Sequence, residues 1–329
     1  MRAPTPVRLL ATAGLAALVV TGCGSSSAPA SRISSAPAVS GAPSNLLPTT
    51  GGTGTIAIAS ANFPENQILA EVYKQALQGA GYDASVKALT TRPVILKALE
   101  SGEIQVEPDY VGSMAKFLNK EKTGSDDLGV DDSDLDATLA KAQELATEKG
   151  LKVLTPSPAA DQNAFAVTRA FATEHSLTTL SDLAGYEGPL VLGATPECKT
   201  YEQCQPGLEK TYGLTFTGFE QTDLGGTLSV SKLKSGKVQL GEFLSSDGNV
   251  KANDFVVLED DKKLQSVDNV VPVLAEKVAG DPLVAEILDK VSAAMSTEDL
   301  IALNATVSVD RKLPAQAATD FLKGKGLIG

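Results

Sequence analysis

Polar side chains gather in this chain at the points where apolar, β-branched runs give way to helical patterns. The stretch IASANFPENQI, residues 58–68, is one such junction, and it carries Ser60, Asn62, Phe63 and Asn66. In open α/β sheets such junctions face the ligand crevice. Amides and hydroxyls there would hydrogen-bond a small molecule, and a ring would stack on it. The alternative is structural, with polar groups capping the next helix and Phe63 packing back against it.

The same pattern recurs at other predicted strand ends and in the segment that precedes the second half of the chain. For Arg92 the alternative is an ion pair with a carboxylate of the chain, and for Asp247 it is capping of the next segment. Together with the first junction, these positions give the predicted ligand-binding residues: Ser60, Asn62, Phe63, Asn66, Thr91, Arg92, Tyr110, Gln162, Asn163, Thr195, Glu242, Ser245 and Asp247.

The chemistry that these residues offer is binding rather than catalysis. The sequence has one histidine, His175, which we expect on a helix surface, and it has no G-x-S-x-G, H-E-x-x-H or Walker A motif. Nucleophile–base pairs are therefore hard to assemble. The acidic stretch 121–136 lacks the glycine and the distal glutamate of a calcium loop, so we interpret it as a solvated loop that caps helix 134–149. We expect no catalytic residue, metal or cofactor.

The alternation of strand-like and helix-like apolar periods predicts two α/β sets. The first, within residues 54–110, has the order strand–helix–strand–helix–strand. The second, within 179–243, has three helix–strand units and precedes a return crossing at 254–278. Three helices then close the chain: 281–294, 296–304 and 315–325. Two lobes joined by two chain crossings make a hinge that can close around a ligand.

The N-terminus has the pattern of an export signal. Two arginines precede an apolar run at 9–20 that is too short to span a bilayer. Thr-Gly-Cys, ending at Cys23, resembles the bacterial lipobox, and the alternative is an ordinary signal peptide with a chance cysteine. The Gly/Ser/Ala/Pro-rich stretch that follows cannot bury itself. We therefore predict a signal peptide at 1–22, a flexible tether at 23–53 and a lipid anchor on Cys23 at the extracytoplasmic face of the cell membrane.

The cysteines and the net charge indicate a disulfide and argue against one class of partner. Cys198 and Cys204 lie six residues apart in a chain predicted to be exported, which favours a disulfide. The alternatives are free thiols or a metal pair, and the metal pair is disfavoured because the histidine lies in another segment. The formal net charge of −12 argues against nucleic acid as a partner, since a phosphate backbone needs lysine and arginine on the protein.

Three blocks of the chain resemble a known family. They are ASANFPENQILAEVYKQALQGAGY from residue 59, TTRPVILKALESGEIQVEPDYVGS from residue 90, and SSDGNVKANDFVVLEDDK from residue 245. Their order and spacing resemble those of the glycine betaine/choline (osmoprotectant) substrate-binding proteins of ABC importers, of the ProX type. The resemblance runs from about residue 54 to the end of the chain.

The resemblance implies a type II periplasmic binding protein, with two α/β lobes joined by a two-crossing hinge. Lobe 1 would comprise 54–158 and 271–329, and lobe 2 would comprise 159–270. Such a protein, expected here as a monomer, captures a small compatible solute of the glycine betaine, choline and carnitine class. It delivers the solute to a membrane permease that is driven by an ATPase. Aromatic rings cage the quaternary ammonium group through cation–π attraction.

The chain departs from the family where that cage should be. Tyr110 is retained, but Asn163, Cys198 and Leu244 stand where the family has rings. Three lost rings at roughly 1–2 kcal/mol each would weaken cation binding by ~10²–10⁴. This predicts, as an alternative, a neutral hydroxylated ligand (a polyol, sugar-like or phenolic molecule) stacked on Tyr110 and Phe63. The alternative of another class is a surface scaffold lipoprotein with a vestigial cleft.

Overall fold

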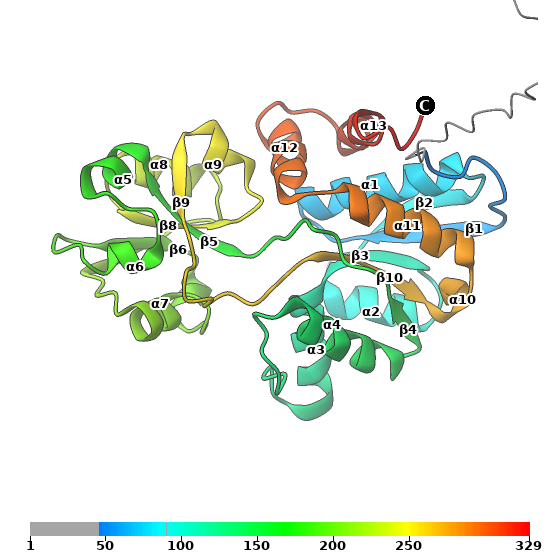
Figure 1. Cartoon of the computed structure of the whole chain (residues 1–329), viewed down its shortest axis with the longest axis horizontal. Coiled ribbons are helices and arrows are strands. Elements are labelled where there is room, and N and C mark those ends of the chain that lie inside the picture. The colour runs from blue at the N-terminus through cyan, green and yellow to red at the C-terminus, as the bar shows by residue number, and fades with distance from the viewer. Residues whose placement is uncertain (1–45, 90) are drawn as a thin grey trace, which may run out of the picture. The chain divides into compact units, whose positions relative to one another are not determined.

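Two five-stranded mixed sheets, each flanked by helices, make up the part of the chain that the computed structural model describes, residues 46–89 and 91–329 (Figure 1). The predicted signal peptide, Cys23 and most of the predicted tether lie outside the described residues. No helix within the described ranges is long and apolar enough to cross a membrane.

The first sheet has the order β2-β1-β3-β10-β4. β1 (Thr55–Ser60) runs parallel to β2 (Asp83–Ala88) and β3 (Val106–Tyr110). The return strand β10 (Val270–Ala275) is antiparallel to both β3 and the short β4 (Leu151–Val153). The carboxyl ends of β1 and β3 therefore meet at one edge of the sheet.

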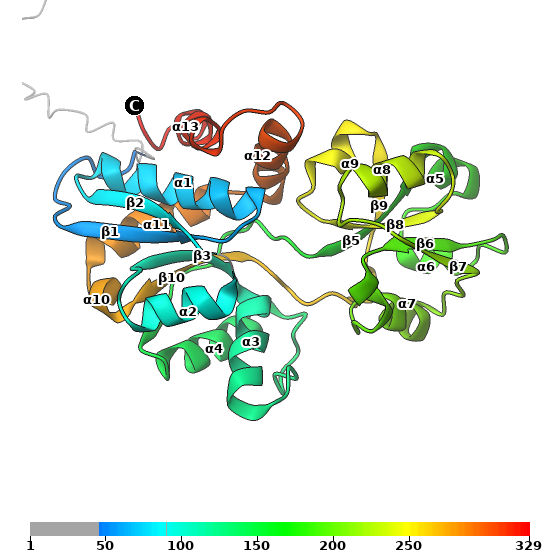
Figure 2. The same ribbon diagram turned by 180° about the vertical axis from the view of Figure 1, so that it is seen from behind.

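Helices cover both faces of this sheet (Figures 1 and 2). One core cluster packs the sheet against four helices: α1 (Pro64–Gly79), α11 (Pro282–Ala294), α12 (Thr297–Ser308) and α13 (Pro314–Gly324). A second cluster packs the other face against α2 (Arg92–Glu100), α3 (Val111–Thr123) and α4 (Leu135–Thr147). The short α10 (Glu276–Ala279) follows β10. We call this body, residues 55–153 with 270–324, the first lobe.

The second sheet has the order β7-β6-β8-β5-β9. β6 (Val191–Ala194) is parallel to β7 (Gly218–Gln221) and β8 (Leu240–Leu244), whereas β5 (Asn163–Thr168) is antiparallel to β8 and β9 (Phe255–Leu258). Its helices are α5 (Arg169–His175), α6 (Leu180–Leu183), α7 (Gln205–Tyr212), α8 (Thr227–Lys234), α9 (Gly248–Ala252) and the 3₁₀ turn η1 (Pro196–Lys199). We call this body, residues 163–258, the second lobe.

Two extended segments connect the lobes, and they are bonded to each other. The Asp161 N–H donates to the carbonyl of Asp268 (3.0 Å), and the Val270 N–H donates to the carbonyl of Ala159 (2.9 Å). An antiparallel bridge joins Ala160 to Asn269 between them. The two crossings therefore form one short ribbon, which gives the hinge a defined register.

The elements of the structure that are missing from the prediction include α3 and β5. No helix is predicted between residue 110 and helix 134–149, yet the buried stripe of Val111, Met114, Ala115 and Leu118 in α3 has helical spacing. No strand is predicted at β5, which pairs with two strands of the second sheet. The predicted helix start at residue 296 is confirmed, because Ser296 and Asp299 form a capping box there.

The last residues of the predicted tether pack against the first lobe. Leu47 is buried in the first-lobe core, and its N–H donates to the carbonyl of Leu327 (2.9 Å). The Gly52 N–H donates to the carbonyl of Ala80 at the end of α1. Residues 47–53, which the sequence assigns to the tether, therefore lie against the first lobe.

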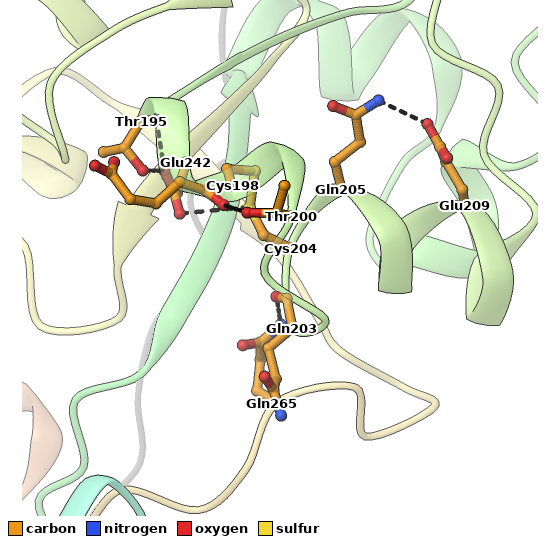
Figure 3. Close-up of a disulfide and its surroundings, with 10 residues drawn as sticks. Thr195, Cys198, Thr200, Gln203, Cys204, Gln205, Glu209, Glu242 and Gln265 are labelled. Carbon is orange, nitrogen blue, oxygen red and sulfur yellow. Dashed lines mark hydrogen bonds between the residues drawn. A yellow bond between two sulfur atoms is a disulfide. The ribbon is translucent and has the colours of Figure 1, made fainter. Parts of the chain in front are cut away.

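A disulfide joins Cys198 in η1 to Cys204 at the start of α7, with the Cα atoms 5.1 Å apart (Figure 3). Both cysteines are buried in the second-lobe core. Their sulfur atoms are bonded to each other and so cannot serve as the thiolate ligands of the metal-pair alternative. The loop between them is further held by Gln265, whose Nε2 donates to the carbonyl of Gln203 (2.8 Å).

Replacing both cysteines in a Cys198→Ala/Cys204→Ala variant should lower the free energy of unfolding by roughly 2–2.5 kcal/mol, because the unfolded chain gains the entropy of an open loop. Urea denaturation measures this difference. Wild-type protein under reducing conditions is the matched control and should lose a similar amount. An unchanged denaturation midpoint in both samples would contradict a stabilising role.

Candidate functional site

A cavity of about 620 Å³ is bordered by residues from both lobes, from the two crossings and from α12. The first lobe contributes the start of α1 and the start of α3, and the second lobe contributes the loops that follow β6, β7 and β8. The lining side chains that carry the argument below are Phe63, Glu65, Arg92, Tyr110, Lys116, Asp161, Asn163, Tyr201, Leu244, Ser246, Asp247, Asp268 and Asn304.

Six of the thirteen predicted ligand-binding residues line this cavity. They come from five separate segments of the chain, which the fold brings to one place: Phe63, Arg92, Tyr110, Gln162, Asn163 and Asp247.

The other seven lie outside the lining, and several have structural roles. Asn66 is buried, and its amide bridges the Ala61 N–H (2.7 Å) and the carbonyl of Pro108 (2.8 Å). Ser60 is buried and donates to the carbonyl of Ala61. Ser245 accepts from the Gln162 N–H and donates to the carbonyl of Ala160, so it fixes the first crossing.

Thr195 and Glu242 are hydrogen-bonded to each other beside the disulfide (Figure 3), and neither lines the cavity. The N–H and the hydroxyl of Thr195 both donate to Glu242 Oε2, at 2.8 and 3.1 Å. Burial raises the pKa of the Glu242 carboxyl.

The exposed residues Asn62 and Thr91 make no side-chain cap, and Phe63 rather than Asn62 is the N-cap of α1. The structural alternative, a side-chain cap on α1 formed by polar residues of the junction, is therefore not found.

Glu65 instead collects donors from three other elements. Its Oε1 accepts from the Tyr110 hydroxyl at the end of β3 (2.5 Å). Its Oε2 accepts from the Ser246 hydroxyl after β8 (2.5 Å) and from the Asn304 amide in α12 (2.5 Å). Because Ser246 belongs to the second lobe and the other three residues to the first, this buried network joins the lobes at the cavity wall.

A proton must be shared within this network. The Ser246 hydroxyl lies 2.5 Å from Glu65 Oε2 and also 2.7 Å from Asp161 Oδ1. A serine hydroxyl carries one hydrogen, so it can donate to only one of the two carboxyl groups. The other contact is attractive only if that carboxyl carries a proton. Burial, and secondly the nearby Glu65, raise the pKa of Asp161 well above its ordinary value.

Two further carboxyl groups line the cavity. Burial raises the pKa of Asp268 to about 6, against the lowering effect of the Ser113 hydroxyl and N–H that donate to it. Burial likewise raises the pKa of Asp247 to about 6, although the Asn249 N–H donates to it (2.8 Å). With Glu65 and Asp161, four acids therefore line the cavity, and burial raises the pKa values of Asp161, Asp247 and Asp268 because it disfavours the ionised carboxylate.

The cationic side chains at the cavity are Arg92 and Lys116. Arg92 binds Asp109 in a two-point contact, at 2.6 and 3.2 Å. Lys116 lies 2.7 Å from a carboxylate oxygen of Asp132 and 2.5 Å from the Ser266 hydroxyl. Neither aspartate partner lines the cavity, so both cations are neutralised from behind.

Three aromatic rings border the cavity. Phe63 and Tyr110 are stacked, with ring centroids 6.4 Å apart and planes inclined by 28°. The third ring is Tyr201, which lies in the disulfide-bonded loop and is 45% exposed. An aromatic face and a carboxylate both attract an organic cation, so the arrangement can hold one.

Residues 54–324 match the family described as the substrate-binding domain of the ABC-type glycine betaine transport system. The chain belongs to this family. It is 28% identical over 273 residues to the glycine betaine-binding protein YehZ of Escherichia coli, a match that covers 80% of this chain and 88% of that protein. It is 27% identical over 285 residues to a glycine betaine-binding protein of Pseudomonas aeruginosa, covering 83% and 89%.

Solved structures of substrate-binding proteins share the architecture. The crystal structure of a glycine betaine/carnitine/choline ABC transporter protein superposes with a TM-score of 0.72 at 23% identity, covering 82% of this chain and 98% of that one. Apo YehZ from Escherichia coli gives 0.70 at 27% identity, covering 83% and 99%. The predicted fold class, two mixed α/β lobes of a periplasmic binding protein, is therefore confirmed.

Several cavity residues of this family member escape prediction from its sequence. Glu65 is not among the predicted binding residues, although it lies in the junction at residues 58–68. Asp161 directly precedes the predicted Gln162, and Asp268 lies in the return crossing, where no motif marks it. The position of Tyr201, an aromatic residue between the two cysteines, could have indicated it as a binding residue. It lies three positions after Cys198, where the resemblance predicts a ring and the structure has a disulfide.

The raised pKa values of Asp247 and Asp268 predict how stability depends on pH. An acid whose pKa is higher in the folded than in the unfolded protein is deprotonated first in the unfolded state. Between about pH 4 and about pH 6 the unfolded chain therefore binds fewer protons, and the free energy of unfolding of the ligand-free protein falls as pH rises. Asp247→Asn, which keeps an acceptor for the Asn249 N–H, should reduce that fall by roughly 1–3 kcal/mol.

Urea denaturation across this pH range provides the measurement. Asp136→Asn is the matched control, since it removes an exposed carboxylate at the start of α4, outside the cavity. It should retain the wild-type fall. A wild-type free energy of unfolding that rises over the same window would contradict the burial of these acids.

Proposed function

We propose that this chain is the extracytoplasmic solute-binding component of an ABC importer and that it captures a quaternary ammonium solute of the glycine betaine, choline and carnitine class. The observation that carries the proposal is the convergence of three rings and four carboxyl groups on one cavity between two hinged lobes. A quaternary ammonium ion cannot donate a conventional hydrogen bond. Ring faces and carboxylates are the groups that stabilise such an ion once it is dehydrated.

Capture would use the hinge. A ligand that contacts Phe63 and Tyr110 on the first lobe and Tyr201 on the second lobe favours the arrangement in which the lobes approach. The Glu65–Ser246 contact already spans the lobes and would register them in that arrangement. The closed form would then be delivered to a membrane permease and its ATPase. No step of this cycle requires catalysis by the chain itself, so the proposed function is not enzymatic.

The lipid anchor at Cys23 belongs to the same proposal. It would keep the receptor, as a monomer, at the extracytoplasmic face of the cell membrane beside its permease. The anchor rests on the lipobox-like sequence and on the family's role in import. Labelling with a radioactive or clickable fatty acid should mark the full-length protein and should fail to mark the Cys23→Ala variant.

Cation binding is tested by isothermal titration with choline and glycine betaine. The Tyr201→Ala variant should bind more weakly by about 5–30-fold, because one ring contributes roughly 1–2 kcal/mol to cation binding. Tyr186→Ala is the matched control. Tyr186 packs against Phe171 and His175 in the second lobe, outside this cavity, so its removal should leave affinity unchanged.

A panel of polyols, sugars and phenols belongs in the same experiment. Asn163 and Leu244 do line the cavity at positions where the family has rings, which is the observation that favours the neutral hydroxylated ligand. Tight binding of a neutral compound, with no binding of choline or of glycine betaine, would overturn the proposed ligand class. If no solute binds or raises the melting temperature, the scaffold alternative would be favoured over a receptor.

A further inference from the structure

The cavity has an excess of negative charge, and this bears on which quaternary ammonium solute it takes. We propose that the site selects solutes with a net positive charge and no carboxylate, such as choline, over zwitterions such as glycine betaine, and that Asp268 and the Lys116–Asp132 pair set this preference. The inference rests on the proposed function and narrows its ligand class.

A zwitterion needs a positive partner for its carboxylate, and the side chains that could provide one are already engaged. Asp109 occupies two donor nitrogens of Arg92 in a geometry typical of a strong arginine–carboxylate pair. Asp132 and Ser266 hold the Lys116 ammonium. Recruiting either cation would require the ligand to compete with a fixed intramolecular carboxylate.

Helix N-termini are the other sites at which a protein can bind an anionic group. Of the helices that begin at the cavity, α2 starts at Arg92 and has no acid in its first turn, whereas α1, α3 and α8 have an acid of the chain bound or placed there. Asp268 accepts the Ser113 N–H in the first turn of α3, and Asp223 accepts the N–H groups of Leu228 and Ser229 in α8. Glu65 lies in the first turn of α1. The positive ends of α1, α3 and α8 are therefore neutralised by the protein, and the first residue of α2, Arg92, is the one already paired with Asp109.

What remains for a ligand is a set of acids that have hydrogen-bond donors but no lysine or arginine salt bridge: Glu65, Asp161, Asp247 and Asp268. Even with one proton shared between Glu65 and Asp161, the negative groups outnumber the positive groups that are not already paired. A cation is attracted by each of these acids that is ionised. A zwitterion gains the same attraction at its ammonium end but must place its carboxylate in a cavity where the nearest charges have the same sign, and like-charge contacts are costly when desolvated.

Asp132 makes the preference adjustable. It contacts Lys116 but does not line the cavity, so an Asp132→Asn substitution removes the competing charge while leaving the cavity wall in place. The freed Lys116 ammonium could then pair with a ligand carboxylate. The unpaired Lys116 ammonium would also repel the ammonium group of choline. The substitution should therefore raise the affinity for glycine betaine and lower the affinity for choline.

The test is isothermal titration of the full receptor chain with choline and with glycine betaine at neutral pH. Wild-type protein should bind choline at least about tenfold more tightly than glycine betaine. A tenfold ratio is what one charge–charge interaction contributes when solvent partly screens it. Asp132→Asn should improve glycine betaine affinity and weaken choline affinity, shifting their ratio by about tenfold or more. Asp268→Asn should weaken choline binding by about tenfold with a smaller effect on glycine betaine.

Asp136→Asn is the matched control, because it removes the same charge from an exposed position outside the cavity and should leave both affinities unchanged. Thermal melts show whether each variant is folded, and the two independent aspartate variants keep the test decisive if one is unstable. Equal or tighter binding of glycine betaine by the wild type would overturn the selectivity while leaving the proposed function standing. Binding of neither solute would overturn both.

Discussion

The burial of the Glu65 carboxylate is the constraint on which the arrangement of the site depends. A carboxylate removed from water must find hydrogen-bond donors, and those for Glu65 come from β3, from α12 and from the segment after β8. Asn304 is 239 positions away in sequence and Ser246 is 181 positions away. One side chain at the first turn of α1 thus orders the cavity edge of both lobes, and displacement of any partner would leave a buried charge uncompensated.

The same principle explains why the cationic side chains near the cavity carry so little free positive charge. Arg92 begins α2 at the carboxyl edge of the first sheet, and the neighbouring strand places Asp109 within reach of two of its nitrogens. Lys116 lies one turn along α3, where the acidic loop before α4 provides Asp132. The acidic loop that composition marks as merely solvated therefore has a role at the site, because its charge controls a cavity-lining lysine.

The disulfide contributes to the cavity by holding the loop that carries Tyr201, and its sulfur atoms do not line the cavity. It closes a short loop in the second lobe, and the Gln265–Gln203 hydrogen bond fixes that loop to the return crossing. Tyr201 is held between the two cysteines, at the wall of the cavity. The resemblance implies a ring at the position of Cys198, and in the structure a ring three residues further along lines the cavity instead. A loop closed at both ends can hold a ring in place even when nearly half of the residue is exposed.

The sequence alone determined most of the strands and helices, the inserted second α/β set, the favoured cysteine pairing and the family, because these follow from local periodicity, spacing and motif. It also indicated Phe63, Arg92, Tyr110 and Asp247 at the cavity, since the carboxyl ends of parallel strands meet at one edge. It did not indicate α3, whose apolar stripe follows β3 directly without a turn signal between them. Only the tertiary structure decided that Glu65, Asp161 and Asp268 converge and that Arg92 and Lys116 are already paired. The physical reason is that the charge of a cavity is a sum over side chains from distant segments, and their distances are set by how the two lobes meet at the hinge.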